Sequence, residues 1–88
     1  MRTTIIGAGE VGFYLASYLC DDHAVTVVDA DPERISYVEE NLDVASLSGD
    51  GSSVSTLIEA EVDECDLFLS VTNDDEVNML SALMAKRM

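Results

Sequence analysis

The chain has 88 residues, 48% of them hydrophobic, and eighteen acidic residues against four basic ones give it a formal net charge of −14. A chain of this size makes a single domain, 1–88, and so acidic a surface repels nucleic acid and anionic lipid, which excludes both as direct partners. No apolar run approaches the ~18 residues that span a bilayer, so we expect no direct membrane insertion.

The chain opens with a strand, a glycine-rich turn and a helix. Residues 3–6 predict an apolar strand, and the next six match G-x-G-x-x-G: Gly7, Ala8, Gly9, Glu10, Val11 and Gly12. A helix follows to about residue 20, because apolar or small residues recur at helical spacing, at Gly12, Leu15, Ala16 and Leu19. A second strand covers residues 25–28 and leads into Asp29, seventeen positions after Gly12.

This order of parts is typical of a dinucleotide-binding site. Gly7 can adopt backbone angles that a side chain forbids, Gly9 lets a pyrophosphate approach the main chain, and Gly12 lets the helix lie close to the strand. The first turn of the helix offers free N–H groups to the phosphates. Asp29 would bind ribose hydroxyls and repel the extra phosphate of NADP, which favours NAD(H) or an adenosine nucleotide. The alternative is a structural glycine turn that binds nothing.

Extended and helical patterns alternate through the rest of the chain. Asp31 is an expected N-cap before Pro32, and the inner face of that helix is predicted to hold Ile35, Val38 and Leu42. Residues 44–47 predict a third strand, and a glycine turn then leads into a short serine-capped helix with three inward residues, Val54, Leu57 and Ile58. Residues 66–71 predict a fourth strand.

A last helix follows the fourth strand. Its capping side chains are expected to come from Thr72, Asn73 and Asp74, and its inner face from Val77, Leu80, Ser81 and Met84. Capping and the helix dipole also account for the polar residues at its start, Asp74, Asp75, Glu76 and Asn78.

Four strands alternating with four helices predict an α/β fold, a Rossmann-like doubly wound parallel sheet with strand order 3-2-1-4. The winding reverses between the first and fourth strands, and ligands of open α/β sheets bind at such a point. We therefore expect the loops after the four strands to converge on one site. These loops are residues 7–12, then Asp29, Ala30 and Asp31, then Gly49, Asp50, Gly51 and Ser52, and finally Thr72 and Asn73.

Catalytic and metal-binding patterns are missing from the sequence. Cys20 and Cys65 are far apart and form no C-x-x-C, so neither a zinc site nor a redox pair is indicated. There is no Y-x-x-x-K pair, Lys86 lies far along the last helix, and His23 falls at the opposite end of the sheet. The sequence therefore favours a binding domain over an enzyme.

The chain resembles the N-terminal nucleotide-binding domain of the TrkA potassium-uptake regulators, also called the RCK or KTN domain. The resemblance covers nearly the whole chain, through I-I-G-A-G-E-V-G at 5–12, V-T-V-V-D at 25–29, S-G-D-G-S at 48–52, A-E-V-D-E-C-D at 60–66 and V-T-N-D-D-E-V-N-M at 71–79. The last stretch is the most specific, because T-N-D-D-E-x-N after the fourth strand is not general to dehydrogenases.

The resemblance implies a cytoplasmic regulatory component that binds NAD(H) or ATP/ADP. It would control a membrane potassium transporter or channel subunit as a homo-oligomer, a dimer or higher, and would lie at the membrane only through that partner. Residues 7–11 would contact the phosphates, Asp29 the ribose, and Asp50 and Gly51 the adenine side. Thr72 and Asn73 would lie near the second phosphate or the nicotinamide ribose. Asp50 could instead be a turn residue that binds its own backbone.

Domains of this family usually continue with a fifth strand, a helix and a sixth strand, whereas this chain ends at Met88. We therefore expect a fragment, or an unusually short form, truncated after the fourth strand–helix unit. Its fourth strand should lie at an open sheet edge and pair with another chain. Two alternatives remain: the cofactor-binding half of an NAD-dependent dehydrogenase, and an oligomerisation module with a degenerate site.

Overall fold

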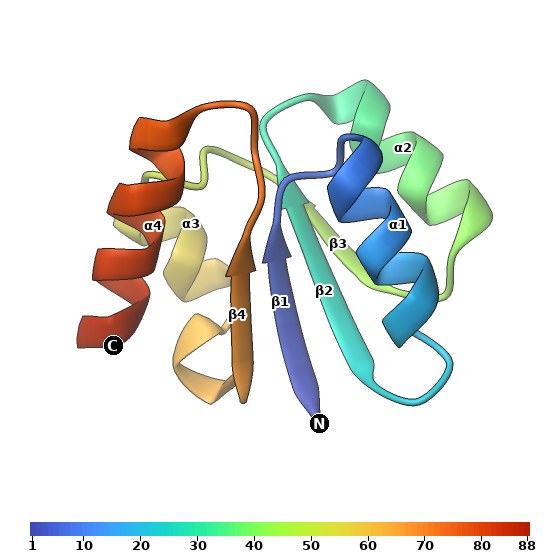
Figure 1. Ribbon diagram of the computed structural model, residues 1–88, viewed down its shortest axis with the longest axis horizontal. Helices are drawn as coiled ribbons and strands as arrows, with labels where there is room; N and C mark the ends of the chain where they lie inside the picture. Colours follow the sequence, from blue (N-terminus) through green and yellow to red (C-terminus); the bar gives the residue numbers. More distant parts are fainter.

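The structure is a computed structural model that describes all residues, 1–88 (Figure 1). Strands and helices alternate along the chain, and most expected boundaries hold to within one or two residues. The elements are β1 (Arg2–Ile6), α1 (Glu10–Leu19), β2 (Ala24–Asp29), α2 (Pro32–Asn41), β3 (Ala45–Ser48), α3 (Val54–Glu59), the 3₁₀ turn η1 (Val62–Glu64), β4 (Leu67–Ser70) and α4 (Asp75–Arg87).

The four strands form one parallel sheet in the order β3-β2-β1-β4, which confirms the predicted topology. In this register Ile5 of β1 lies between Val27 of β2 and Leu69 of β4. Because all strands run the same way, their carboxyl ends meet at one edge of the sheet, the upper edge in Figure 1. The winding reverses between β1 and β4, at the centre of that edge.

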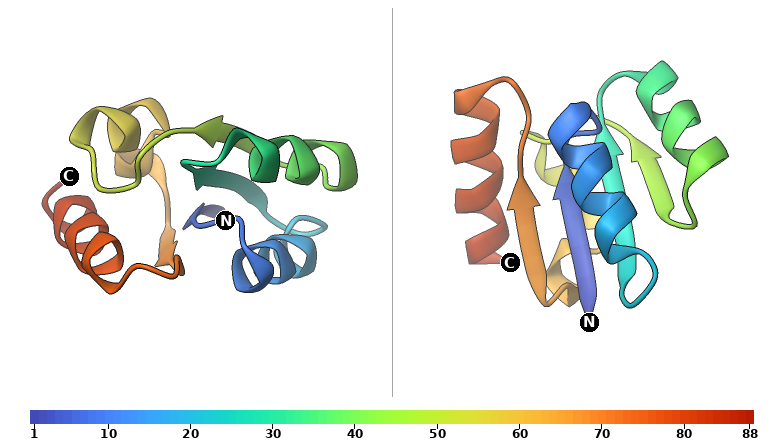
Figure 2. Two further views of the ribbon diagram at one scale, coloured as in Figure 1. Left: turned by 90° about the horizontal axis from the view of Figure 1, so that it is seen from above. Right: turned by 45° about the vertical axis from the view of Figure 1, so that its right-hand side comes forward.

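Helices cover both faces of the sheet. The left view of Figure 2 shows α1 and α2 on one side and α3 and α4 on the other. Successive residues of β1 therefore enter different cores: Ile5 packs with the α1–α2 side and Ile6 with the α3–α4 side. A strand buried on both faces lacks the alternation of apolar and polar residues, and in β1 Thr3 and Thr4 are buried together with Ile5 and Ile6.

The glycine turn brings α1 against the end of β1. Gly7 has φ +116°, a conformation that favours glycine, and its N–H donates to Val28 O at 2.7 Å. A Cβ built on Gly12 would lie 1.8 Å from Gly7 O, so this close packing requires glycine at position 12. Both roles were predicted from the sequence.

Three residues expected to face inward do not. In α3 only Leu57 is buried, while Val54 is 50% exposed and Ile58 59% exposed. A helix of six residues presents only a narrow stripe to the sheet, so its flanking positions stay in solvent. In α4 Leu80 is 50% exposed because the helix turns the small, fully buried Ser81 toward β4.

The cap expected at α3 also differs from its prediction. Ser53 occupies the N-cap position but caps no backbone group, and its hydroxyl pairs with that of Ser55 at 2.9 Å. By contrast, Asp31 caps α2 as predicted, accepting from the N–H of Glu33 at 2.9 Å.

Strand β4 forms one edge of the sheet and pairs only with β1. All four of its residues are partly exposed. The open edge expected from the sequence is therefore present in this chain, and what pairs with it stays a prediction. No helix of the structure combines the length and the apolar character that crossing a bilayer demands.

Candidate functional site

The loops at the carboxyl edge of the sheet enclose two adjoining pockets. The glycine-loop pocket, of about 320 Å³, lies over the turn between β1 and α1 and is lined by Gly7, Gly9, Glu10, Val11 and Val71. The β3-side pocket, of about 290 Å³, is lined by Ile6, Val28, Ala30, Asp50, Gly51, Asp74 and Val77. Both pockets share Asp29, Arg34, Thr72 and Asn73. Together they form one cleft, called here the carboxyl-edge cleft.

Ten of the fifteen site residues expected from the sequence line this cleft: Gly7, Gly9, Glu10, Val11, Asp29, Ala30, Asp50, Gly51, Thr72 and Asn73. The other five do not: Ala8, Gly12, Asp31, Gly49 and Ser52. Ala8 belongs to the hydrophobic core. Gly12 lies within α1, on the side packed against Gly7, while Asp31 and Ser52 hold the loops on either side.

The start of α1 is open toward the cleft. Gly9 occupies the N-cap position, and no side chain caps the helix. The first N–H groups of a helix have no partner within it, so those of α1 are available to a ligand. A Cβ built on Gly9 would meet one neighbouring atom within 4 Å, Nη1 of Arg34 at 3.6 Å. A negatively charged group can therefore reach the main chain and the positive end of the helix dipole.

Asp29 ties the ends of two loops together. Its side chain is only 10% exposed. Oδ2 accepts a hydrogen bond from the N–H of Ala8 at 2.7 Å, and Oδ1 accepts one from the N–H of Asp31 at 2.8 Å. A carboxylate can accept about four hydrogen bonds, so capacity for two ribose hydroxyls remains. The sequence pointed to this acid as a ligand contact and gave no sign of its structural role.

Arg34 lies in the cleft, and sequence reasoning missed it. It extends from the first turn of α2, with Nη1 3.8 Å from Asp29 Oδ2 and Nε 3.9 Å from Asp31 Oδ2. It is the one basic residue that lines either pocket. Its i,i+3 spacing from Asp31 within the segment D-A-D-P-E-R was the signal that could have identified it.

Asp50 shapes the loop after β3. Its Oδ1 accepts hydrogen bonds from the hydroxyl of Ser52 at 2.6 Å and from the N–H of Ser52 at 2.8 Å. These two bonds, the hydroxyl first, hold the pKa of the Asp50 carboxyl below its usual range. The turn role left open by the sequence is therefore present, and Asp50 also borders the β3-side pocket.

Asn78 fixes the loop after β4, which corrects its assignment to helix capping. Its Oδ1 accepts from the N–H of Thr72 at 3.0 Å and from the Thr72 hydroxyl at 2.7 Å, and its Nδ2 donates to Thr72 O at 3.0 Å. The cap of α4 is Asp74 alone, which accepts from the N–H groups of Glu76 and Val77 at 2.9 and 3.3 Å. Asn78 thus positions a cleft loop from inside the helix.

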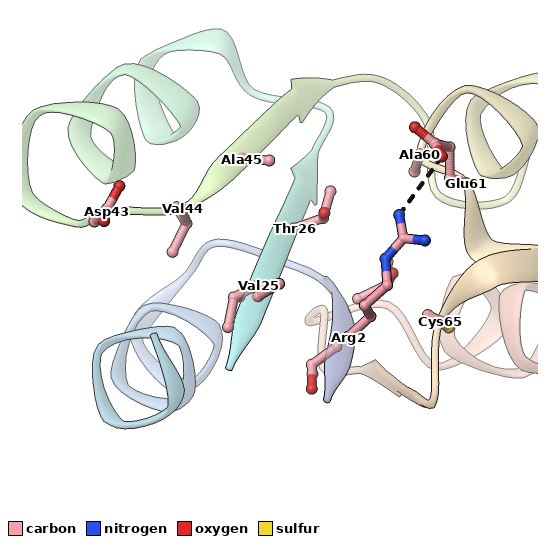
Figure 3. A pocket seen from close by; sticks show the side chains of 12 residues that line it. Arg2, Val25, Thr26, Asp43, Val44, Ala45, Ala60, Glu61 and Cys65 are labelled. Atoms are coloured by element: carbon pink, nitrogen blue, oxygen red, sulfur yellow. Dashed lines mark ion pairs between the residues drawn. The ribbon is translucent and has the colours of Figure 1, made fainter. Parts of the chain in front are cut away.

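A larger pocket, of about 440 Å³, lies at the opposite edge of the sheet (Figure 3). Its basic residue, Arg2, is already paired: Nη2 lies 3.5 Å from Glu61 Oε2 and Nη1 4.0 Å from Glu64 Oε2. The pocket is bordered by residues that follow the ends of α2 and α3, where helix dipoles are negative. An anion is therefore held better in the carboxyl-edge cleft, although each of its two pockets is smaller.

The parallel sheet, its order and the glycine turn at its switch point define a Rossmann-like α/β domain of the type that binds nucleotides. The chain belongs to the TrkA-N domain family, whose model matches residues 3–88. The resemblance seen in the sequence is thereby confirmed.

Several curated proteins are similar to this chain. A "Trk system potassium uptake protein TrkA homolog" of Archaeoglobus fulgidus is 45% identical over 87 residues, 99% of this chain and 20% of the relative. The "Trk system potassium uptake protein TrkA" of Halomonas elongata is 41% identical over 88 residues, 99% of this chain and 19% of the relative. A homolog from Methanothermobacter thermautotrophicus is 33% identical over 87 residues, 98% of this chain and 40% of the relative. The chain thus spans about a fifth of the length of the first two.

Proposed function

We propose that this chain is the nucleotide-binding part of a regulatory protein of a potassium uptake system, and that the carboxyl-edge cleft takes NAD(H) or ATP/ADP. The observation that carries the proposal is the open start of α1 beside the carboxylate of Asp29. Free N–H groups there suit phosphates, and the adjacent carboxylate suits ribose hydroxyls. Family membership and the names of the relatives support the potassium link.

In this proposal the two pockets divide the ligand between them. Gly7, Gly9, Glu10 and Val11 contact the phosphates in the glycine-loop pocket, and Asp29 binds the adenosine ribose at the border of the pockets. The β3-side pocket, with Val28, Asp50 and Gly51, receives the adenine. Thr72 and Asn73 lie beside the second phosphate or the nicotinamide ribose.

The proposed role is regulatory and not catalytic. The residues that line the cleft include no His, Lys, Tyr or Cys, the side chains that most often serve as bases beside a nicotinamide. A guanidinium carries N–H donors and no acceptor, so Arg34 is not suited to act as a base. This composition supports binding over the dehydrogenase alternative. Turnover of any simple alcohol or acid in a hydride-transfer assay would favour the dehydrogenase.

Regulation requires a partner protein and an assembly that can adopt two arrangements. We propose that the chain acts at the cytoplasmic side of the membrane, within a homo-oligomer attached to a potassium transporter or channel subunit. The ligand can shift such an assembly only by its difference in affinity for the two arrangements. The open edge of β4 is the proposed site of pairing with another chain. A monodisperse monomer in light scattering at high concentration would contradict that pairing.

Titration calorimetry with NADH, NAD⁺, ATP and ADP tests the binding proposal. We expect saturable binding of at least one of them, weakened about tenfold or more in Asp29→Asn, because a charge-assisted hydrogen bond to the ribose is lost. The matched control is Asp43→Asn, since Asp43 borders the pocket at the opposite edge. Absence of binding by all four ligands, or equal affinity in Asp29→Asn and the parent, would overturn the proposal.

A further inference from the structure

We propose that Arg34 contacts the phosphates of the ligand, and that its guanidinium makes the cleft prefer nucleotides that carry linked phosphates over nucleosides. The inference rests on the proposed function, since it assumes that an adenine nucleotide enters the carboxyl-edge cleft. It assigns to α2 a contact that the glycine loop alone does not provide.

The position of the guanidinium carries this inference. A Cβ added to Gly9 would point to the side from which a ligand reaches the main chain of the glycine loop. Nη1 of Arg34 lies 3.6 Å from the position of that Cβ. A phosphate that rests on the start of α1 therefore also meets the tip of Arg34. The same side chain borders the β3-side pocket, so it lies where the two parts of the ligand join.

The charge of the cleft explains why this contact matters. Four acidic residues line it, Glu10, Asp29, Asp50 and Asp74, against the single cation Arg34. The whole chain carries a net charge of −14. The N-terminus of a helix supplies the equivalent of only about half a positive charge. A ligand with several negative charges therefore needs a full cation nearby.

The present contacts of Arg34 leave it free to serve a ligand. Its separations from Asp29 and Asp31, 3.8 and 3.9 Å, are longer than hydrogen bonds. Its side chain is 48% exposed. A guanidinium presents five donors in a planar fork that matches phosphate oxygens, so it can turn toward a phosphate while staying near one carboxylate.

The test is a titration of adenosine, AMP and ADP, which carry none, one and two phosphates, into the parent chain, Arg34→Ala and Arg34→Lys. We expect the affinity of the parent to rise with the number of phosphates. Arg34→Ala should weaken ADP about tenfold or more, because a charge-assisted contact is lost, and leave adenosine nearly unchanged. Arg34→Lys should keep part of the preference for ADP over adenosine, since it keeps the positive charge but loses the planar set of guanidinium donors.

The matched control is Arg87→Ala, which removes the same charge at the exposed end of α4. It should change ADP affinity by about twofold or less, because exposed charges act weakly through solvent. Melting temperatures of all variants check that each is folded.

Three results would overturn the assignment in distinguishable ways. ADP affinity in Arg34→Ala equal to that in Arg87→Ala would show that Arg34 makes no phosphate contact. An equal fall for adenosine and ADP would show that Arg34 orients Asp29 or stacks on the adenine instead. If the parent chain binds none of the three ligands, and none of NADH, NAD⁺ and ATP, the proposed function fails and the assignment fails with it.

Discussion

Replacement of Gly9 by alanine separates the ligand-binding role of the glycine loop from its structural role. Gly9 has φ −73° and ψ −161°, extended angles that are open to any residue. The added methyl would meet only Nη1 of Arg34 at 3.6 Å, the end of a flexible side chain. The fold should therefore accept Gly9→Ala, while the methyl takes the space through which a phosphate reaches the helix start.

Gly9→Ala should change the stability of the fold less than it changes ligand affinity. Alanine is a poorer N-cap than glycine, which costs about 1 kcal/mol or less, and a lower entropy of the unfolded chain offsets about half of this. The melting temperature should change by about 5 °C or less. Loss of one charge-assisted hydrogen bond to a phosphate costs about 1.5–3 kcal/mol, which lowers affinity about tenfold or more.

Gly12→Ala is the matched comparison and, unlike Gly9→Ala, should destabilise the fold. Its Cβ would lie 1.8 Å from Gly7 O and 2.7 Å from Gly7 C, both rigid backbone atoms. Helix α1 must then move away from β1, and overpacking of this kind costs about 1–3 kcal/mol or more. We expect a melting temperature lower by about 5–20 °C.

Thermal unfolding followed by circular dichroism, together with calorimetric titration of ADP and NADH, measures both quantities. Parent-like affinity in Gly9→Ala would refute the reasoning about phosphate approach. Equal destabilisation by both substitutions would refute the reasoning about backbone packing.

Three further predictions concern stability and ionisation. Leu57→Ala should destabilise the fold by about 2–5 kcal/mol in chemical denaturation, because it empties a core position, whereas Ile58→Ala, at an exposed position of the same helix, should change it by about 0.5 kcal/mol or less. Asn78→Ala should cost about 1–3 kcal/mol, since it leaves backbone groups of the β4 loop without partners, and Asn41→Ala, which removes one exposed hydrogen bond, should cost less in the same assay. The Asp50 carboxyl should titrate below 3.8 in the folded chain by NMR. Because the pKa of the Asp50 carboxyl is lower in the folded chain than in the unfolded chain, the carboxylate contributes stability above the unfolded pKa, and this contribution is lost as pH falls through the folded pKa. A titration midpoint at or above 3.8 would contradict the two hydrogen bonds from Ser52.

The sequence predicted the sheet and the glycine turn because both depend on local patterns. Apolar runs and helical stripes alternate along the chain, and the handedness of parallel crossovers then leaves few topologies. The roles of Gly7 and Gly12 follow from backbone geometry that a three-glycine pattern encodes directly.

The contacts between loops could not be predicted in the same way. Arg34, Asp29 and Ala8 come together only after α2 and the glycine loop pack at one edge of the sheet. No periodic pattern in the sequence indicates how close these three residues lie. The position of Asn78 at the start of the last helix predicts a capping role, yet its side chain reaches back to Thr72. The exposure of Ile58 depends on how short α3 is.

The central claim is that the carboxyl-edge cleft binds an adenine nucleotide, and an amide NMR titration of the labelled chain tests it most directly. With ADP or NADH we expect saturable shifts of the Gly9, Glu10 and Val11 amides and of the loop at Asp29, while Thr26 and Ala45, at the opposite pocket, stay unchanged. Shifts confined to that opposite pocket, or no saturable shift with NAD⁺, NADH, ATP or ADP, would contradict the account.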